Sequence, residues 1–95
     1  MKASAPRPGP GEPRYVRQPL DELLEAFAAR EPAPGGGVAA VVTVALGAAL
    51  TAMAARFSEE HTPDAAAVAR DADALRARVL PLADEDAAAY GEVLA

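Results

Sequence analysis

Large apolar residues recur at helical spacing in the first patterned segment of the chain. Four of them fall at i, i+3, i+4 and i+7: Leu20, Leu23, Leu24 and Phe27. This spacing places them on one face of an α-helix. Pro19 suits the first turn of such a helix, and the Pro-Ala-Pro run after Glu31 stops it, because a residue before proline is pushed out of the α region. The pattern predicts a helix over residues 20–30.

A second apolar segment, residues 38–55, follows three consecutive glycines. No charged residue lies among the 24 positions between Glu31 and Arg56. A helix that is apolar on every side must be enclosed on every side, by protein or by lipid. At ~1.5 Å per residue the segment spans about 27 Å, which is marginal for a bilayer core. Because the segment is rich in alanine, the pattern favours the central helix of a bundle over a membrane span.

A third helix is predicted from Pro63 toward the end of the chain. Thr62 is a suitable N-cap for it, and Pro81 should kink it. Its residues form two rows at heptad spacing: Val68, Leu75 and Leu82 in one, and Ala72, Val79, Asp86 and Val93 in the other. Three predicted helices around a central apolar one indicate an all-α helical bundle.

Asp86 occupies a position that the pattern assigns to the apolar interior. On a regular helix it lies on the leucine face, whereas Asp84 lies about 160° away and should face solvent. A carboxylate among aliphatic side chains costs free energy unless it is paired or hydrogen-bonded, and such groups are over-represented at active sites. The hydroxyl of Tyr90, one turn later, could share that interior. The alternative is that the kink at Pro81 rotates the last turns and leaves Asp86 on the surface.

The three glycines after Pro34, Gly35, Gly36 and Gly37, leave several backbone amides unobstructed at the positive end of the next helix. This arrangement suits a carboxylate, another anion, or the close approach of a flat ring. The segment matches neither the P-loop nor the G-x-G-x-x-G pattern. The alternative is a tight connection in which glycine permits positive φ.

Composition and charge exclude several classes of protein. Alanine supplies 26 residues, Ile and Trp are absent, and there is neither cysteine nor more than one histidine. These counts exclude sheet proteins and thiol chemistry, and they make a metal site improbable. The net charge of −5 argues against a nucleic-acid partner. Residues 1–18, rich in proline and glycine, are expected to form a disordered lead-in to a domain over residues 19–95, and the lack of a secretory signal favours a cytoplasmic protein.

Three segments together resemble the cyclodeaminase/cyclohydrolase family. The first runs from Leu23 to Gly37 and ends in Pro-Ala-Pro-Gly-Gly-Gly. The second is the alanine-rich run from Leu46 to Met53, and the third reads Leu-Ala-Asp-Glu-Asp-Ala-Ala-Ala-Tyr over residues 82–90. The resemblance covers residues 19–95 in order and corresponds to the first half of the family's domain.

The resemblance implies an all-α, up-and-down helical bundle that is usually homodimeric and acts as an enzyme of one-carbon metabolism. Its members release ammonia from 5-formiminotetrahydrofolate or hydrolyse methenyltetrahydrofolate, and they need no metal or cofactor beyond the tetrahydrofolate substrate. By this resemblance Asp86 is the catalytic carboxylate. The residues expected to bind substrate are Pro34, Gly35, Gly36, Gly37 and Tyr90. The family usually has serine where this chain has Val38.

Two other functions remain open from the sequence. The chain could be a non-catalytic helical module whose copies cover each other's apolar helix, or a small membrane protein. Folate binding would separate the enzyme from the module, and extraction without detergent would exclude the membrane protein. The sequence does not distinguish the cyclodeaminase from the cyclohydrolase reaction, because both need the same elements.

Overall fold

The computed structural model describes residues 15–30 and 34–94, with side chains up to residue 89. Within these ranges the structure is helical and contains no strand. The helices are α1 (Leu20–Ala28), α2 (Gly36–Phe57), α3 (Ala65–Val79) and α4 (Leu82–Leu94). The predicted all-α fold is therefore confirmed. Of the predicted lead-in over residues 1–18, positions 1–14 lie outside the described residues.

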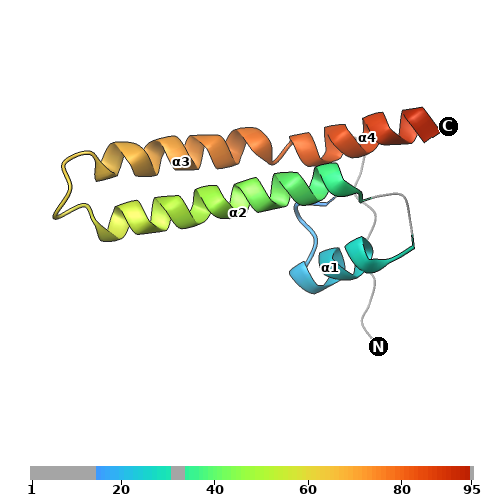
Figure 1. Cartoon of the computed structure of the whole chain (residues 1–95), viewed down its shortest axis with the longest axis horizontal. Coiled ribbons are helices and arrows are strands. Elements are labelled where there is room, and N and C mark those ends of the chain that lie inside the picture. The colour runs from blue at the N-terminus through green and yellow to red at the C-terminus, as the bar shows by residue number, and fades with distance from the viewer. Residues whose placement is uncertain (1–14, 31–33, 95) are drawn as a thin grey trace.

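The helices α2 and α3 form a long antiparallel hairpin, and α4 continues roughly along the direction of α3 (Figure 1). As a result, α4 packs on the first half of α2. The short helix α1 lies beside that same end of α2 (Figure 1). The first turn of α2 is therefore the place where segments from three parts of the chain meet.

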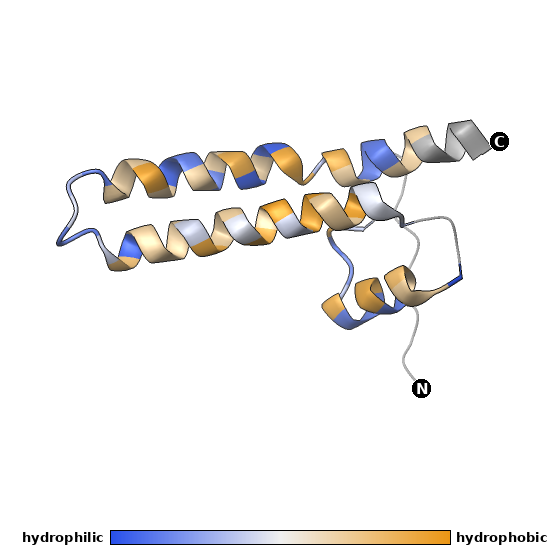
Figure 2. Ribbon diagram, in the orientation of Figure 1, coloured by the Kyte–Doolittle hydropathy of each residue, from blue (hydrophilic) through white to orange (hydrophobic). Residues whose placement is uncertain are grey.

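Small residues form the seam of the hairpin. The buried residues of α2 are Val38, Ala45, Ala48, Ala52 and Ala55, and those of α3 are Ala65, Ala69 and Ala72. Alanine lets two helix backbones approach closely and loses no side-chain entropy on burial. Figure 2 shows apolar residues along nearly all of α2, while apolar and polar residues alternate on α3.

The large apolar residues predicted to fill the interior of the third helix are not buried. Val68, Leu75 and Leu82 were expected inside, but they are 43%, 37% and 46% exposed. The alanines are inside instead, because a seam of close-packed helices has no room for long side chains. Large residues therefore lie at its borders.

The kink expected at Pro81 is a complete break between two helices. Proline lacks the backbone N–H that would bond to the preceding turn, so α3 ends at Val79 and α4 begins at Leu82. The backbone N–H of Ala83 bonds to the carbonyl of Leu80 at 3.2 Å, which bridges the break with a tight turn. The break resets the register of α4 relative to α3.

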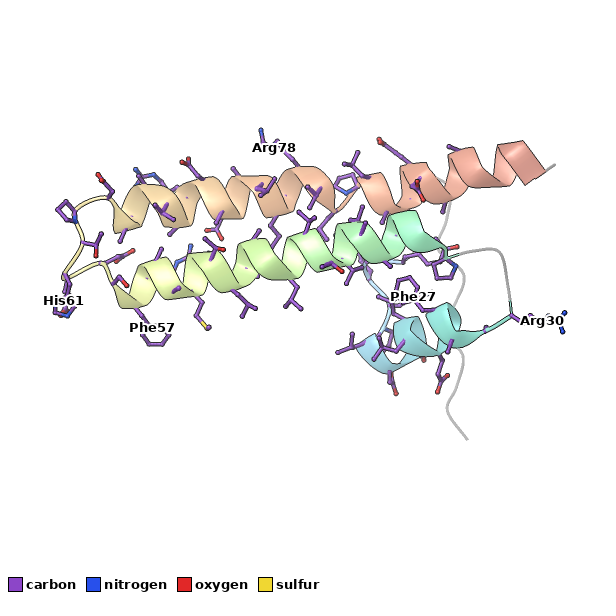
Figure 3. All side chains as sticks on the ribbon, viewed as in Figure 1. Phe27, Arg30, Phe57, His61 and Arg78 are labelled. Carbon is purple, nitrogen blue, oxygen red and sulfur yellow. The ribbon has the colours of Figure 1, made fainter. Side chains whose placement is uncertain are left out.

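The outer face of α2, opposite α3, is apolar and uncovered. Its large exposed side chains are Leu46, Leu50, Met53 and Phe57. Figure 3 shows Phe57 pointing away from α3. By length and composition α2 could cross a membrane: its most apolar window has a mean hydropathy of 2.2, and 28% of that window is buried. The hydroxyls of Thr43 and Thr51 bond to carbonyls one turn earlier, so they add no unsatisfied donor to this face.

Tyr15 and Val16, near the end of the segment predicted as the lead-in, pack against the helices. Tyr15 is only 4% exposed and forms a core cluster with Leu23, Val38 and Ala83, against which Val16 and Phe27 pack. We call this set, Tyr15, Leu23, Val38 and Ala83, the proximal core. It joins the segment before α1, α1 itself, α2 and α4 at one end of the hairpin.

Candidate functional site

The first turn of α2 follows Pro34 and the N-cap Gly35. Pro34 is buried, and Gly35 is the N-cap in an extended conformation with φ −103° and ψ −163°. No side chain caps this helix end. The carbonyl of Gly35 accepts the first helical bond, from the N–H of Ala39 at 3.2 Å. The earlier N–H groups of the turn have no intrahelical acceptor, which gives this end a partial positive charge.

The carboxylate of Asp86 lies against Gly37 in this turn. Both carboxylate oxygens and the carboxyl carbon occupy the space that a Cβ at position 37 would take. Only glycine at this position lets the side chain come so close to the backbone of α2. The structure thus brings together Asp86 and the glycine segment, although they are far apart in the sequence.

Gly37 is needed for close approach, and the turn does not use glycine for positive φ. Gly35 has negative φ, and neither Gly36 nor Gly37 adopts the left-handed region. A Cβ at Gly36 would meet nothing within 4 Å. The turn therefore has one position filled by the Asp86 carboxylate and a neighbouring position open to an incoming molecule.

Asp86 itself is exposed, so the expectation that it points into an aliphatic interior is wrong. The break at Pro81 turns α4 so that Ala83 is buried and Asp86 lies at the edge facing Gly37. This outcome matches the alternative in which Pro81 leaves Asp86 at the surface. The surface position is nevertheless against the helix end and not remote from it.

Asp84 was expected to be solvated, and this expectation is also wrong. The residue is half-buried, and its Oδ1 accepts a hydrogen bond from the backbone N–H of Tyr15 at 3.3 Å. Sequence reasoning missed Tyr15 because it follows a stretch rich in proline and glycine. The available signal was the Tyr15-Val16 pair, the first adjacent large apolar residues of the chain.

The remaining predicted residues are placed as follows. Pro34 is buried next to the turn, and Gly35 and Gly36 belong to it. Tyr90 lies within α4, but its side chain is outside the described residues. Across the described residues, no group of three or more His, Cys, Asp or Glu side chains is arranged to hold a metal ion.

A second polar cluster lies along the hairpin, away from the glycine turn. Arg56 of α2 donates a hydrogen bond to Asp73 of α3, and Arg76 lies 3.4 Å from the other oxygen of Asp73. The hydrogen bond from Arg56 lowers the pKa of Asp73, and the same bond raises the pKa of Arg56. The hydrogen bond from Arg56 to Oδ2 of Asp73 ties the two helices together, while Oδ1 of Asp73 has an ion-pair contact with Arg76 but no hydrogen bond.

A comparison with known protein families gives a match over most of the chain. The family described as formiminotransferase-cyclodeaminase matches residues 19–95. No curated protein and no solved structure matches the chain. The matched range includes α1, the glycine turn, the alanine seam and the acidic segment of α4. Since the match extends over most of the sequence, the chain belongs to the formiminotransferase-cyclodeaminase family, which is a family of folate one-carbon enzymes.

Proposed function

We propose that this chain acts on one-carbon derivatives of tetrahydrofolate, as a formiminotetrahydrofolate cyclodeaminase or a methenyltetrahydrofolate cyclohydrolase. In this proposal Asp86 transfers protons and the first turn of α2 binds the substrate. The observation that carries the proposal is the contact between the Asp86 carboxylate and Gly37. It puts an acid/base group directly beside the free amides of a helix end.

The cyclodeaminase reaction needs a proton to move between two nitrogen atoms. N10 of 5-formiminotetrahydrofolate attacks the carbon of the protonated formimino group, –CH=NH2⁺, and forms a tetrahedral intermediate. N10 then loses its proton, the formimino nitrogen gains one, and the C–N bond to that nitrogen breaks to release ammonia and leave the methenyl cation. An exposed carboxylate such as Asp86 can take the proton from N10 and return it to the departing nitrogen.

The charge of Asp86 also suits the product. The methenyl group carries a positive charge that develops during the loss of ammonia, and a nearby carboxylate stabilises it. In the hydrolytic reaction the same carboxylate would accept a proton from the attacking water. The open space at Gly36 leaves room for a flat ring beside the carboxylate.

The test uses Asp86→Asn, which keeps the shape of the side chain but removes its ability to accept a proton. Turnover of 5-formiminotetrahydrofolate and hydrolysis of methenyltetrahydrofolate are followed by the absorbance of the methenyl form, and binding is measured by calorimetry. Turnover should fall by about 10²-fold or more, with unchanged helical circular dichroism. The matched control is Asp71→Asn, because Asp71 is an exposed carboxylate on α3. Equal turnover of the two variants would remove Asp86 from the mechanism.

A second candidate function, a helical oligomerisation module, is favoured by the uncovered face of α2. That face carries no charge, so two copies of the chain can approach without repulsion. Lipid is a poor alternative, since α3 lies alongside α2 and its Arg70, Asp71 and Arg78 are exposed; Figure 3 shows Arg78 on the side of α3 away from α2. In a bilayer each such charge would cost about 2.5–3.5 kcal/mol. If a second copy of the chain covers this face, the melting temperature should rise with protein concentration. If oligomerisation is the whole function, the chain should not bind folate.

A further inference from the structure

The segment before α1 crosses the start of α4 and is anchored on both sides. Tyr15 is buried in the proximal core, and the N–H of Gln18 bonds to its carbonyl at 3.2 Å in a tight turn. The backbone N–H of Tyr15 donates to Oδ1 of Asp84. We call residues 15–18 together with Asp84 the strap. It links chain positions 69 residues apart.

The strap restricts the rotation of α4 about its own helix axis. Asp84 lies in the first turn of α4, two residues before Asp86. Because both residues are fixed to the same helical turn, holding Asp84 also sets the direction of Asp86. A rotation of α4 by about 20° would move a carboxylate roughly 5 to 6 Å from the axis by about 2 Å, which is enough to separate it from Gly37.

The rest of the contact surface leaves this rotation weakly restrained. Ala83 is buried and Ala87 packs against the proximal core, but each presents only a methyl group, which fixes orientation poorly. Leu82 is largely exposed, and the break at Pro81 uncouples α4 from the regular hydrogen bonding of α3. The Arg56–Asp73 pair joins α2 to α3 and does not hold α4.

We infer that Tyr15 and Asp84 are positioning residues, which hold the Asp86 carboxylate over the first turn of α2. The inference rests on the proposed function for its consequence in turnover, since displacement of a reacting group by about 1 Å can cost 10²-fold. The contact itself is a property of the free chain. It can therefore be tested without folate.

The test follows the chemical shift of the Gly37 amide by NMR as the solution is acidified from neutral pH until the carboxylates are protonated. Asp86→Asn identifies the part of the shift that comes from this carboxylate. Asp84→Ala removes the acceptor for the Tyr15 N–H, and we expect it to reduce that part of the shift by at least about half. Asp84→Asn keeps an acceptor oxygen, so the part of the Gly37 shift that comes from Asp86 should be retained. Phe57→Ala, an exposed aromatic at the far end of α2, is the control and should leave it unchanged.

A merely structural role for the strap gives a different result. Asp84→Ala would then lower the free energy of unfolding while the Gly37 amide titrates with its full amplitude, and this outcome would overturn the inference. If Asp84→Ala does not fold, Tyr15→Leu replaces it, because leucine keeps an apolar side chain but lacks the aromatic ring that anchors the strap in the proximal core. A partial loss of amplitude is expected there, and full amplitude again overturns the inference.

Folate measurements separate this inference from the proposed function. Asp84→Ala should lower kcat by roughly 10²-fold with little change in KM, and Asp84→Asn should restore it. Failure of the wild-type chain to bind any folate would overturn the proposed function but not the positioning of Asp86, which the Gly37 amide reports independently.

Discussion

Replacing Gly37 by alanine tests the contact with Asp86 most directly, and Gly36 supplies a matched control in the same turn. Alanine in place of glycine stabilises a helix by roughly 0.5–1 kcal/mol. At position 36 the added methyl group meets open space, so Gly36→Ala should show this gain. At position 37 the methyl group would occupy the place of the Asp86 carboxylate.

The conflict at position 37 is resolved by movement of the Asp86 side chain, since its carboxylate is the far end of a flexible group. A strained rotamer costs about 0.5–1.5 kcal/mol, and removing the carboxylate from the helix N-terminus costs about 0.3–1 kcal/mol. These costs offset the helical gain. We therefore expect Gly37→Ala to be about 1–2 kcal/mol less stable than Gly36→Ala.

The assay is urea unfolding followed by far-ultraviolet circular dichroism, repeated in an Asp86→Ala background. Without the carboxylate, Gly37→Ala should recover the full helical gain, so the double-mutant cycle should give a coupling energy of about 1 kcal/mol. Equal stability of the two glycine variants, or additivity of Gly37→Ala and Asp86→Ala within about 0.3 kcal/mol, would refute the close contact.

Three further predictions concern the rest of the molecule. The hydrogen bond from Arg56 lowers the pKa of Asp73 from its usual 3.8, so the stabilisation is present at neutral pH and is lost as the pH falls through the lowered pKa. The melting temperature of Asp73→Asn should therefore depend less on pH in the acid range than that of the wild-type chain. Leu50→Glu should abolish any concentration dependence of the melting temperature, as measured across a dilution series, because it charges the outer face of α2. Leu23→Ala should lower the free energy of unfolding in urea by about 2–5 kcal/mol, whereas Leu24→Ala, at an exposed position, should change it by about 0.5 kcal/mol or less.

The helices and their breaks were predictable from the sequence because proline and glycine act locally. The start of α2 at the glycines and the interruption at Pro81 follow from backbone chemistry at single residues, whereas α1 ends at Ala28, two residues before the predicted stop. The juxtaposition of the glycine turn with the acidic segment came from the family resemblance. Periodicity alone did not place Asp86 against Gly37.

The inner face of α3 and α4 was not predictable from hydrophobicity. Large apolar residues carry the strongest pattern, so Val68 and Leu75 were expected inside, whereas the seam is made of alanine. The hydrogen bond from Tyr15 to Asp84 spans most of the chain and depends on how α4 is rotated after Pro81. No local rule describes that rotation, because it results from packing among segments far apart in the sequence.

The alanine seam has a thermodynamic consequence. A methyl group exposes little new apolar surface to water when the helices separate, and it is this newly hydrated surface that raises the heat capacity on unfolding. The hairpin should therefore show a heat-capacity increment well below the usual ~12–15 cal/mol/K per residue. Its stability would then vary along a shallow, broad curve between cold and warm conditions.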